Sequence, residues 1–276
     1  MPYATAADGL ALYLEEEGCG EAVLFAHEFG GDWRSWQPQV EHFRSRYRCL
    51  RYAARGFLPS AVPEAAERYG QAQATADLLA VAEAAGLGRF HLVGLSMGAY
   101  TALCAALAAP ERLLSLTLAG CGSGPADAAE RARYRAELRR EIDLLDRLGA
   151  EGAVRWFARD PAYRRMAGKR PAAWATYCEN LRGQALLGAK RTLSTLHWNR
   201  QPLAARAAEL ARLRVPTLLV YGDEDHRLVR PANDFLQRTL PCVSALVLEV
   251  TGHLVTLEEP ARFNTALERH LAGAGR

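Results

Sequence analysis

Three side chains in this sequence have the types and the order needed for nucleophilic catalysis by a serine: Ser96, Asp225 and His253. A serine hydroxyl is a weak nucleophile at neutral pH, so it needs a base that removes its proton. A histidine acts as that base when a carboxylate holds its ring in one tautomer and stabilises its positive charge. The chemistry that such residues would carry is attack on a carbonyl carbon.

The serine lies in the pentapeptide Gly94–Gly98, a G-x-S-x-G sequence. The apolar residues 90–93 precede it and the small-residue stretch 99–109 follows it, so its context is strand, sharp turn and helix. In such a turn the serine adopts a strained backbone conformation that exposes its hydroxyl at the end of the strand. Glycines flank the turn because side chains there would collide with the neighbouring strand and helix. The alternative is an ordinary turn with a surface serine, but this context favours a nucleophile.

The acid and the base follow the serine, each in a loop after an apolar run. The run 216–221 leads into a loop with three acidic residues, of which we choose Asp225 as the triad acid. Asp223 directly follows the loop glycine, where an aspartate commonly stabilises the turn itself. The run 245–250 leads into His253, which we predict to be the base. A lone histidine is more often structural, but the order serine, acid, histidine indicates catalysis.

Two backbone N–H groups should stabilise the negative charge that develops on the carbonyl oxygen. We expect one from Met97, the residue after the nucleophile, and one from Phe29, in the glycine-rich loop after the run 22–26. Their side chains would also line the acyl pocket. Glu28 is a puzzle, because a carboxylate beside this oxyanion hole would oppose the developing charge. It either faces solvent, or braces the loop, or contacts a polar group of the substrate.

Strands and helices alternate along most of the chain. Apolar runs predict strands over 9–16, 22–26, 48–52, 90–94, 114–119, 216–221 and 245–250. Helices are predicted over about 35–44, 69–85 and 261–271. Because the strands are almost continuously apolar and separated by helices, we expect an α/β fold with a mostly parallel central sheet covered on both faces.

The alternation breaks between residues 125 and 201, which read as helical, charged and strandless. We therefore expect a core domain of residues 1–124 and 202–276, with residues 125–201 inserted as a helical cap. A cap with apolar residues over the serine favours a small or medium, largely apolar acyl or lactone substrate. Five of its aromatic residues are candidates for the pocket, or alternatively anchor the cap helices: Trp156, Phe157, Trp174, Tyr177 and Trp198.

The composition limits the class of protein. The chain has 276 residues, half of them hydrophobic, and a formal net charge of +3 with scattered basic residues. Neither a nucleic-acid partner nor a membrane partner is indicated. The six cysteines have no metal-binding spacing and no basic-then-apolar leader is visible, so we expect free thiols and a cytoplasmic location. We expect no metal and no cofactor, and the oligomeric state stays open.

With these residues in place, the chain resembles the α/β-hydrolase fold family, in particular its cap-bearing branch of esterases and lactonases. The resemblance covers nearly the whole chain and rests on His27-x-x-Gly30-Gly31, Trp36-x-x-Gln39, Arg55-Gly56, Gly94 to Gly98, Gly222-x-x-Asp225 and Gly252-His253. In that family the triad acid lies a few residues into its loop, which again points to Asp225. Epoxide hydrolases and haloalkane dehalogenases of this fold use an aspartate nucleophile, so Ser96 argues against both.

The resemblance implies a serine hydrolase that cleaves a carboxylic ester or a lactone through an acyl-enzyme. The substrate would be a small molecule. Two alternatives remain open. One is C–C bond hydrolysis on the same triad, although Leu254 stands where such hydrolases typically carry an aromatic residue. The other is a ligand-binding protein on this fold with slow turnover.

Overall fold

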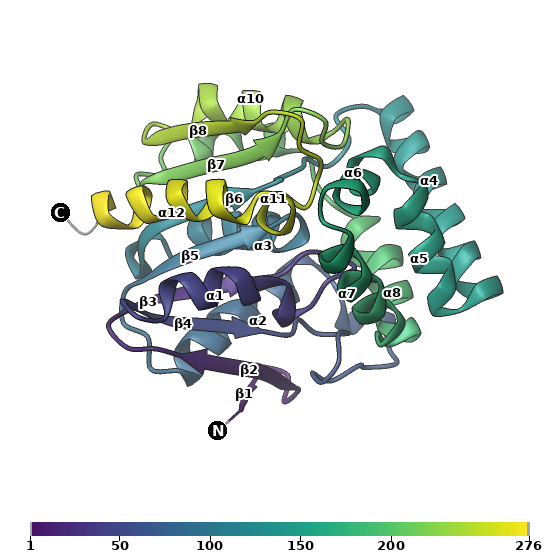
Figure 1. Ribbon diagram of the computed structural model, residues 1–276, viewed down its shortest axis with the longest axis horizontal. Helices are drawn as coiled ribbons and strands as arrows, with labels where there is room; N and C mark the ends of the chain where they lie inside the picture. The colour runs from purple at the N-terminus through teal and green to yellow at the C-terminus, as the bar shows by residue number, and fades with distance from the viewer. Residues whose placement is uncertain (1, 275–276) are drawn as a thin grey trace.

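The computed structural model describes residues 2–274 and has a β-sheet at its centre (Figure 1). The strands are β1 (Tyr3–Thr5), β2 (Ala11–Glu17), β3 (Glu21–Ala26), β4 (Tyr47–Tyr52), β5 (Phe90–Leu95), β6 (Leu113–Ala119), β7 (Thr217–Gly222) and β8 (Val243–Leu248). They form one eight-stranded sheet in the order β1-β2-β4-β3-β5-β6-β7-β8. Only the pairs β1–β2 and β2–β4 run antiparallel, and all other neighbours are parallel. The predicted α/β fold with a mostly parallel sheet is therefore confirmed.

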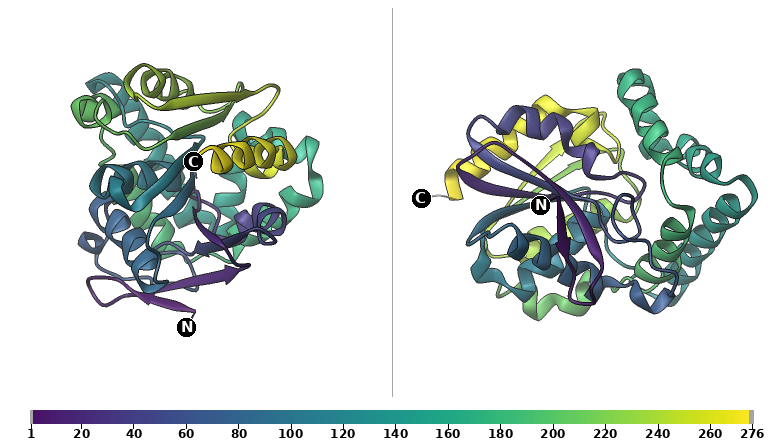
Figure 2. Two further views of the ribbon diagram at one scale, coloured as in Figure 1. Left: turned by 90° about the vertical axis from the view of Figure 1, so that its left-hand side faces the viewer. Right: turned by 90° about the horizontal axis from the view of Figure 1, so that it is seen from below.

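Helices cover both faces of this sheet (Figure 2). On one face α1 (Gln37–Phe43) packs beside α12 (Pro260–Ala274), and on the other α2 (Gln71–Ala84) packs beside α3 (Met97–Ala108). The sequence analysis did not predict the next helix on that second face, α10 (Val229–Thr239). The remaining helical turns of the core are short: η1 (Trp33–Trp36), η2 (Ala66–Arg68), η3 (Pro110–Arg112), η5 (Leu203–Arg206), α9 (Ala207–Leu210) and α11 (Val255–Glu258).

Apolar layers on each face hold the sheet in place. Trp36 and Phe263 are fully buried on the face that α1 and α12 cover, and the Trp36 ring lies 5.0 Å from that of Phe25 on β3. Leu78 and Val81 of α2 are fully buried in the layer on the opposite face. Burial of each such side chain contributes roughly 1.5–3 kcal/mol. Because both layers are apolar, every residue of β5 is buried, which explains its apolar sequence, in which His91 is the one polar side chain.

A helical insertion stands between β6 and β7, at the edge where the parallel strands end (Figures 1 and 2). Its helices are α4 (Ala128–Leu148), α5 (Ala150–Arg159), α6 (Pro161–Lys169), α7 (Pro171–Arg182), α8 (Leu186–Thr192) and the π-helical turn η4 (Leu193–His197). Residues 120–216, all of them described, contain no strand. The helical character predicted for this region is thus present, whereas its status as a separate cap domain stays a prediction.

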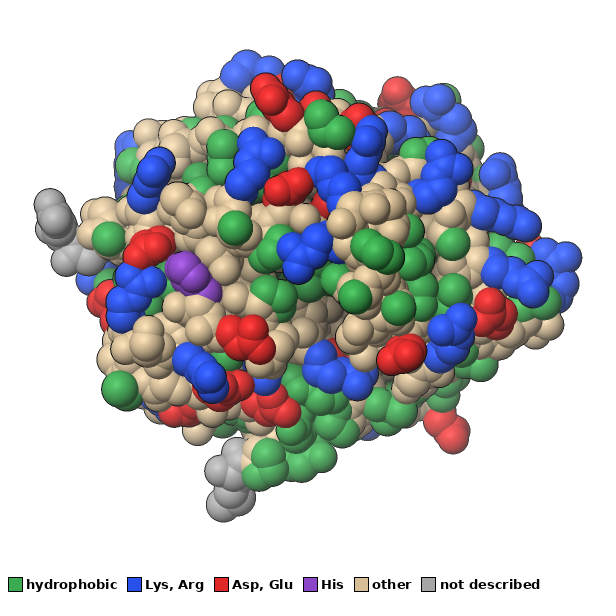
Figure 3. All heavy atoms as spheres, in the orientation of Figure 1, with side chains coloured by type: hydrophobic (Ala, Val, Ile, Leu, Met, Phe, Trp, Pro, Cys, Tyr) green, Lys and Arg blue, Asp and Glu red, His purple; other side chains and the backbone are tan. Residues whose placement is uncertain are grey.

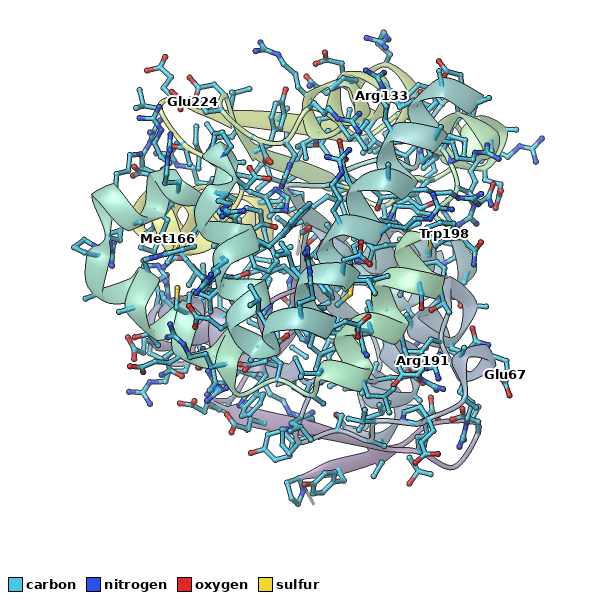
Figure 4. The ribbon with its side chains drawn as sticks, turned by 90° about the vertical axis from the view of Figure 1, so that its right-hand side faces the viewer. Glu67, Arg133, Met166, Arg191, Trp198 and Glu224 are labelled. Carbon is cyan, nitrogen blue, oxygen red and sulfur yellow. The ribbon has the colours of Figure 1, made fainter. Side chains whose placement is uncertain are left out.

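The outer surface of the insertion is rich in basic side chains (Figure 3). Seen from the insertion side, Met166 of α6 and Trp198, just after η4, lie toward opposite edges of the helices (Figure 4). Across residues 2–274, no helix has both the length and the apolar character that a bilayer crossing requires.

Candidate active site

Ser96 occupies a strained turn between β5 and α3. Its φ of 53° and ψ of −107° lie where residues other than glycine are uncommon. Its backbone N–H donates to the carbonyl of Ala119 at 2.8 Å, which ties the turn to the end of β6. A Cβ on Gly98 would collide with the Ala26 carbonyl, and one on Gly94 with the Gly98 carbonyl. The elbow therefore packs too closely for side chains at either glycine, as its sequence predicts.

A chain of hydrogen bonds joins the three residues that the sequence analysis selected. His253 Nε2 lies 2.7 Å from Ser96 Oγ, and His253 Nδ1 lies 2.6 Å from Asp225 Oδ1. The carboxylate accepts, so Nδ1 carries the ring proton and Nε2 is free to accept the serine proton. Burial by itself lowers the pKa of His253, but the adjacent Asp225 carboxylate outweighs it and the net shift of the pKa is upward. The geometry and the charge are those of a general base.

The two aspartates of the β7 loop have different partners. Asp225 is almost completely buried, and its Oδ1 accepts from the His226 N–H at 2.6 Å as well as from the His253 ring. Asp223 is exposed, and its Oδ1 accepts from the Thr251 N–H at 3.1 Å. Asp223 therefore ties the β7 loop to the β8 loop, and Asp225 is the carboxylate that faces the histidine.

The loop after β3 carries Phe29 and is braced by a histidine. The ring of His27 donates from Nδ1 to the Glu28 carbonyl at 2.7 Å and accepts at Nε2 from the Ala54 N–H at 2.9 Å. Burial lowers the pKa of His27, so the ring stays neutral and keeps both bonds. Met97 is the first residue of α3, where a backbone N–H has no helical carbonyl to bind.

Glu28 does not face solvent, so that alternative is wrong. Its side chain is completely buried, and Oε1 accepts from the Ser35 hydroxyl at 2.8 Å. Within residues 2–274, Oε2 has no hydrogen-bond partner, and burial raises the pKa of this carboxyl to about 7. A Cβ on Gly31 would collide with the Glu28 carboxyl. Glu28 thus braces its loop, and it is not among the residues that line the cavity beside Ser96.

A cavity of about 520 Å³ opens over the serine. Ser96, His253 and Phe29 line it from the core, while Phe157 and Tyr163 line it from the insertion. Its size falls in the range of small-molecule sites. Among the described residues, no three His, Cys, Asp or Glu side chains are grouped so that they could hold a metal ion. The described residues thus form a cavity into which the hydroxyl of Ser96 opens.

Residues 21–260 match the family model described as "alpha/beta hydrolase fold". The chain belongs to the alpha/beta hydrolase fold family. It is 27% identical over 245 residues to the "3-oxoadipate enol-lactonase 1" of Acinetobacter baylyi, covering 88% of this chain and 85% of that protein. It is 28% identical to a "putative carbamate hydrolase RutD" of Azorhizobium caulinodans, covering 97% of each chain. A thermophilic esterase from Thermogutta terrifontis superimposes with a TM-score of 0.84 at 25% identity, covering 99% of this chain and 98% of the esterase.

The structure of this hydrolase separates the five aromatic residues that the sequence analysis proposed for the pocket. Trp156 and Phe157 line the cavity, whereas Trp174, Tyr177 and Trp198 are not among the lining residues. The buried ring of Tyr177 stacks on Trp174 with centroids 5.8 Å apart. The ring of Trp198 lies against the guanidinium groups of two α4 arginines, each 4.7 Å from its centroid. These three side chains therefore anchor insertion helices, which was the alternative.

The insertion of the hydrolase also holds the histidine loop. The backbone N–H of His253 donates to the Ala162 carbonyl on α6 at 2.7 Å. The ring of Tyr163, the next residue on that helix, lies 5.2 Å from the His253 ring. On the same helix, Lys169 binds Glu258 at 3.1 Å and Glu259 at 2.7 Å. Helix α6 thus fixes the position of the candidate base.

Tyr163 and Glu141 are among the residues of the hydrolase cavity that sequence reasoning missed. Nothing in the spacing of Tyr163 marks it, because its contact with His253 is made between segments distant in the chain. Glu141 did leave a signal. It falls on the same helical stripe as Leu138 and Leu145, which are buried, so a charged residue interrupts an apolar face.

Proposed function

We propose that this hydrolase cleaves a carboxylic ester or a lactone with Ser96 as nucleophile, His253 as general base and Asp225 as the acid that orients it. One observation carries the proposal. Hydrogen bonds of 2.6 and 2.7 Å run without a break from Asp225 through His253 to the Ser96 hydroxyl, inside a cavity that admits a small molecule. That arrangement activates a serine and serves no evident structural need.

The reaction would proceed in two halves. His253 removes the proton of Ser96 as the hydroxyl oxygen attacks the substrate carbonyl, and Asp225 stabilises the imidazolium that results. The N–H groups of Met97 and Phe29 stabilise the negative oxygen of the tetrahedral intermediate. His253 then returns its proton to the leaving oxygen, and an acyl-enzyme remains on Ser96. Water, deprotonated by His253, releases the acid product and restores the serine.

The choice of ester or lactone is supported by the relatives. One is named an enol-lactonase and another an esterase, and both names describe cleavage between a carbonyl carbon and an oxygen. The same triad chemistry serves either bond, because a lactone is a cyclic ester. No metal or cofactor takes part in any of these steps.

We also propose that residues 125–201 act as the cap of a core made of residues 1–124 and 202–276. The insertion helices supply one wall of the cavity, including Trp156 and Phe157. Their position over the strand ends would exclude bulk water from the acyl-enzyme and restrict which substrates enter. The chemical groups, by contrast, all come from the core.

The nucleophile can be tested directly with a serine-reactive fluorophosphonate. Intact protein should gain one adduct by mass spectrometry, and Ser96→Ala should gain none. Chromogenic esters and lactones should be hydrolysed by the wild type and not by the variant. Equal labelling of the variant would refute the assignment. Turnover of vinylogous diketones without turnover of esters would indicate C–C bond hydrolysis in place of the proposed function.

A further inference from the structure

The cavity beside Ser96 is lined by five carboxylates but only two arginines. Four of the carboxylates already have a partner in the protein. Glu137 pairs with Arg227 at 3.1 Å, Glu224 with Arg165, Asp225 with His253 at 2.6 Å, and Asp160 accepts from the Ala162 N–H at 2.9 Å. The fifth is Glu141, which makes no hydrogen bond or ion pair with any residue in 2–274.

Glu141 is buried in a place where a carboxylate is costly. Its side chain belongs to the apolar stripe of α4, and only 6% of the residue is exposed. Burial, with a further contribution from the charge of Asp160, raises the pKa of Glu141 to about 8. A buried ionisable group without a partner destabilises the folded protein. Such a group remains tolerable when a ligand supplies the partner that the protein lacks.

Aromatic rings surround the same space. Trp156, Phe157, Tyr163 and Tyr134 all line the cavity together with Glu141. Ring faces attract cations, and Glu141 adds a full opposite charge in its ionised form, which a bound cation favours over the protonated form. This combination is chemically complementary to an alkylammonium group. The face of the insertion seen in Figure 3, by contrast, carries many Lys and Arg side chains.

Arg200 is the group in the cavity wall that argues for an anionic ligand instead. Its Nε and one terminal nitrogen have no hydrogen-bond partner among the described residues. However, its guanidinium carbon lies 4.9 Å from the ring centroid of Tyr100, so its charge already has an aromatic partner. Arg200 is also only half-buried, whereas Glu141 is buried and has neither kind of partner. Glu141 is thus the charged side chain of the cavity wall that has no hydrogen bond, ion pair or aromatic partner among residues 2–274.

We propose that Glu141 binds a positively charged nitrogen of the substrate. The inference rests on the proposed function and narrows it: the hydrolase would act on an ester or lactone that carries an ammonium group away from the scissile carbonyl. The core would supply the reacting groups, and α4 would select the charge.

Two esters of the same shape test this. The p-nitrophenyl esters of 4-(trimethylammonio)butanoate and of 5,5-dimethylhexanoate differ in charge and hardly in volume. Wild-type kcat/KM should favour the cationic ester by about 10- to 100-fold, which corresponds to about 1.4–2.8 kcal/mol. In Glu141→Gln the preference should fall to about one while the neutral ester is still hydrolysed. Glu141→Asp, which keeps the charge, should retain part of the preference.

The matched control is Asp143→Asn. Asp143 lies two residues further along α4 and is exposed. Its substitution therefore removes one carboxylate from the same helix, outside the cavity. This variant should keep the full preference. Equal rates for the two esters in wild type would overturn the proposal. So would a preference for the p-nitrophenyl monoester of adipate that disappears in Arg200→Gln, because it would assign an anion to Arg200.

A binding measurement separates this inference from the proposed function. Calorimetry with tetramethylammonium on Ser96→Ala needs no turnover. Tetramethylammonium should bind to Ser96→Ala, and the double variant Ser96→Ala with Glu141→Gln should bind it at least 10-fold more weakly. If no ester is hydrolysed but this binding holds, the hydrolase function fails and the cation site stands. If esters are hydrolysed but the ion binds equally with and without Glu141, the cation site fails.

Discussion

The two walls of the cavity differ in how well their polar groups are satisfied. On the core wall, Ser96, His253 and Asp225 are joined to one another by short hydrogen bonds, and Oδ2 of Asp225 is the one polar atom of these three side chains that is buried without a partner among residues 2–274. On the insertion wall, Glu141 is 6% exposed, lines the cavity and has no hydrogen-bond or ion-pair partner among residues 2–274. The Nε2 of His197 is buried and unpartnered among the same residues. The core wall is thus preorganised for a reaction that does not depend on the rest of the substrate. The insertion wall is incomplete until a ligand fills it.

This difference has a physical reason. Catalysis requires groups held in place before the substrate arrives, because reorganisation during the reaction would raise the barrier. Recognition requires groups whose hydrogen bonds and charges are still free, because only an unsatisfied group gains from a correct ligand and penalises a wrong one. The core wall is built on strand ends in a packed sheet, and the insertion wall on helices that evolve without disturbing that sheet.

The largest effect should follow from breaking the core wall. Ser96→Ala and His253→Ala should each lower kcat for a chromogenic ester by roughly 10⁴-fold or more, and the double variant by about as much as either alone. The non-additivity arises because the two residues act as one unit. Steady-state kinetics on variants with unchanged circular dichroism measure this. Additive losses would mean that the residues do not share one step.

The next effect compares the two aspartates of the β7 loop. Asp225→Asn should lower kcat by roughly 10²- to 10⁴-fold, because the ring of His253 loses the carboxylate that fixes its tautomer. Asp223→Asn should cost far less, since Asp223 contacts the Thr251 backbone and not the histidine. Kinetics at equal folded fraction give the ranking. The reverse ranking would make Asp223 the triad acid.

A third prediction concerns the unpartnered carboxyl of the insertion wall. The pKa of Glu141 rises from the ordinary 4.5 to about 8 on folding, so the folded state holds a proton that the unfolded state has lost between these pH values. Stability should therefore fall as pH rises through this window. Glu141→Gln should have the same melting temperature as wild type near pH 4 and a higher one at pH 8 to 9. A difference of a few kcal/mol in the free energy of unfolding corresponds to a rise of up to roughly 10 °C.

Glu28 gives a control for that pH dependence. Its pKa is raised to about 7, again by burial, so the Glu28→Gln advantage should also grow above pH 4.5 but level off about one pH unit earlier. Thermal melts from pH 4 to pH 9 distinguish the pH dependence of Glu28→Gln from that of Glu141→Gln. A Glu141→Gln variant that melts lower than wild type at pH 9 would show that this carboxylate has a stabilising partner.

The smallest effect should come from the apolar part of the insertion wall. Trp156→Ala removes a side chain that lines the cavity. The kcat/KM for long acyl esters should therefore fall by an amount equivalent to about 1–3 kcal/mol of transition-state stabilisation, while the kcat/KM for acetate esters should change little. Trp198→Ala is the control, because Trp198 packs on two α4 arginines outside the lining. A matched series of short and long esters is the measurement. Equal slowing of all esters by Trp156→Ala would make that residue structural.

Much of the fold and of the core wall could be predicted from the sequence. Strands β3, β5, β6 and β7 appeared as apolar runs because both of their faces are covered, and the elbow appeared because only glycine fits beside Ser96. These are local patterns, set by the packing around a few consecutive residues. Helix α10 was not predicted, although its sequence carries the signal: Val229, Ala232 and Leu236 are buried at helical spacing.

The insertion wall was much harder to predict. Large aromatic residues in helices look alike in sequence, whether they line a cavity like Trp156 or pack on arginines like Trp198. Their placement depends on how six helical segments pack, which no local pattern encodes. The burial of Glu28 was not predicted for the same reason. Ser35 and other residues around the loop shield this side chain from solvent, although the loop looked exposed in the sequence.

The sequence by itself determined the order of strands and helices, the elbow that presents Ser96, and the histidine and acid that follow it. Each of these is written in consecutive residues whose conformational limits are local. Only the tertiary structure decided which oxygen faces which nitrogen, which aromatic rings reach the cavity, and that Glu141 is buried without a partner. Those facts depend on contacts between segments far apart in the chain, and the free energy of a charge depends on everything that packs around it.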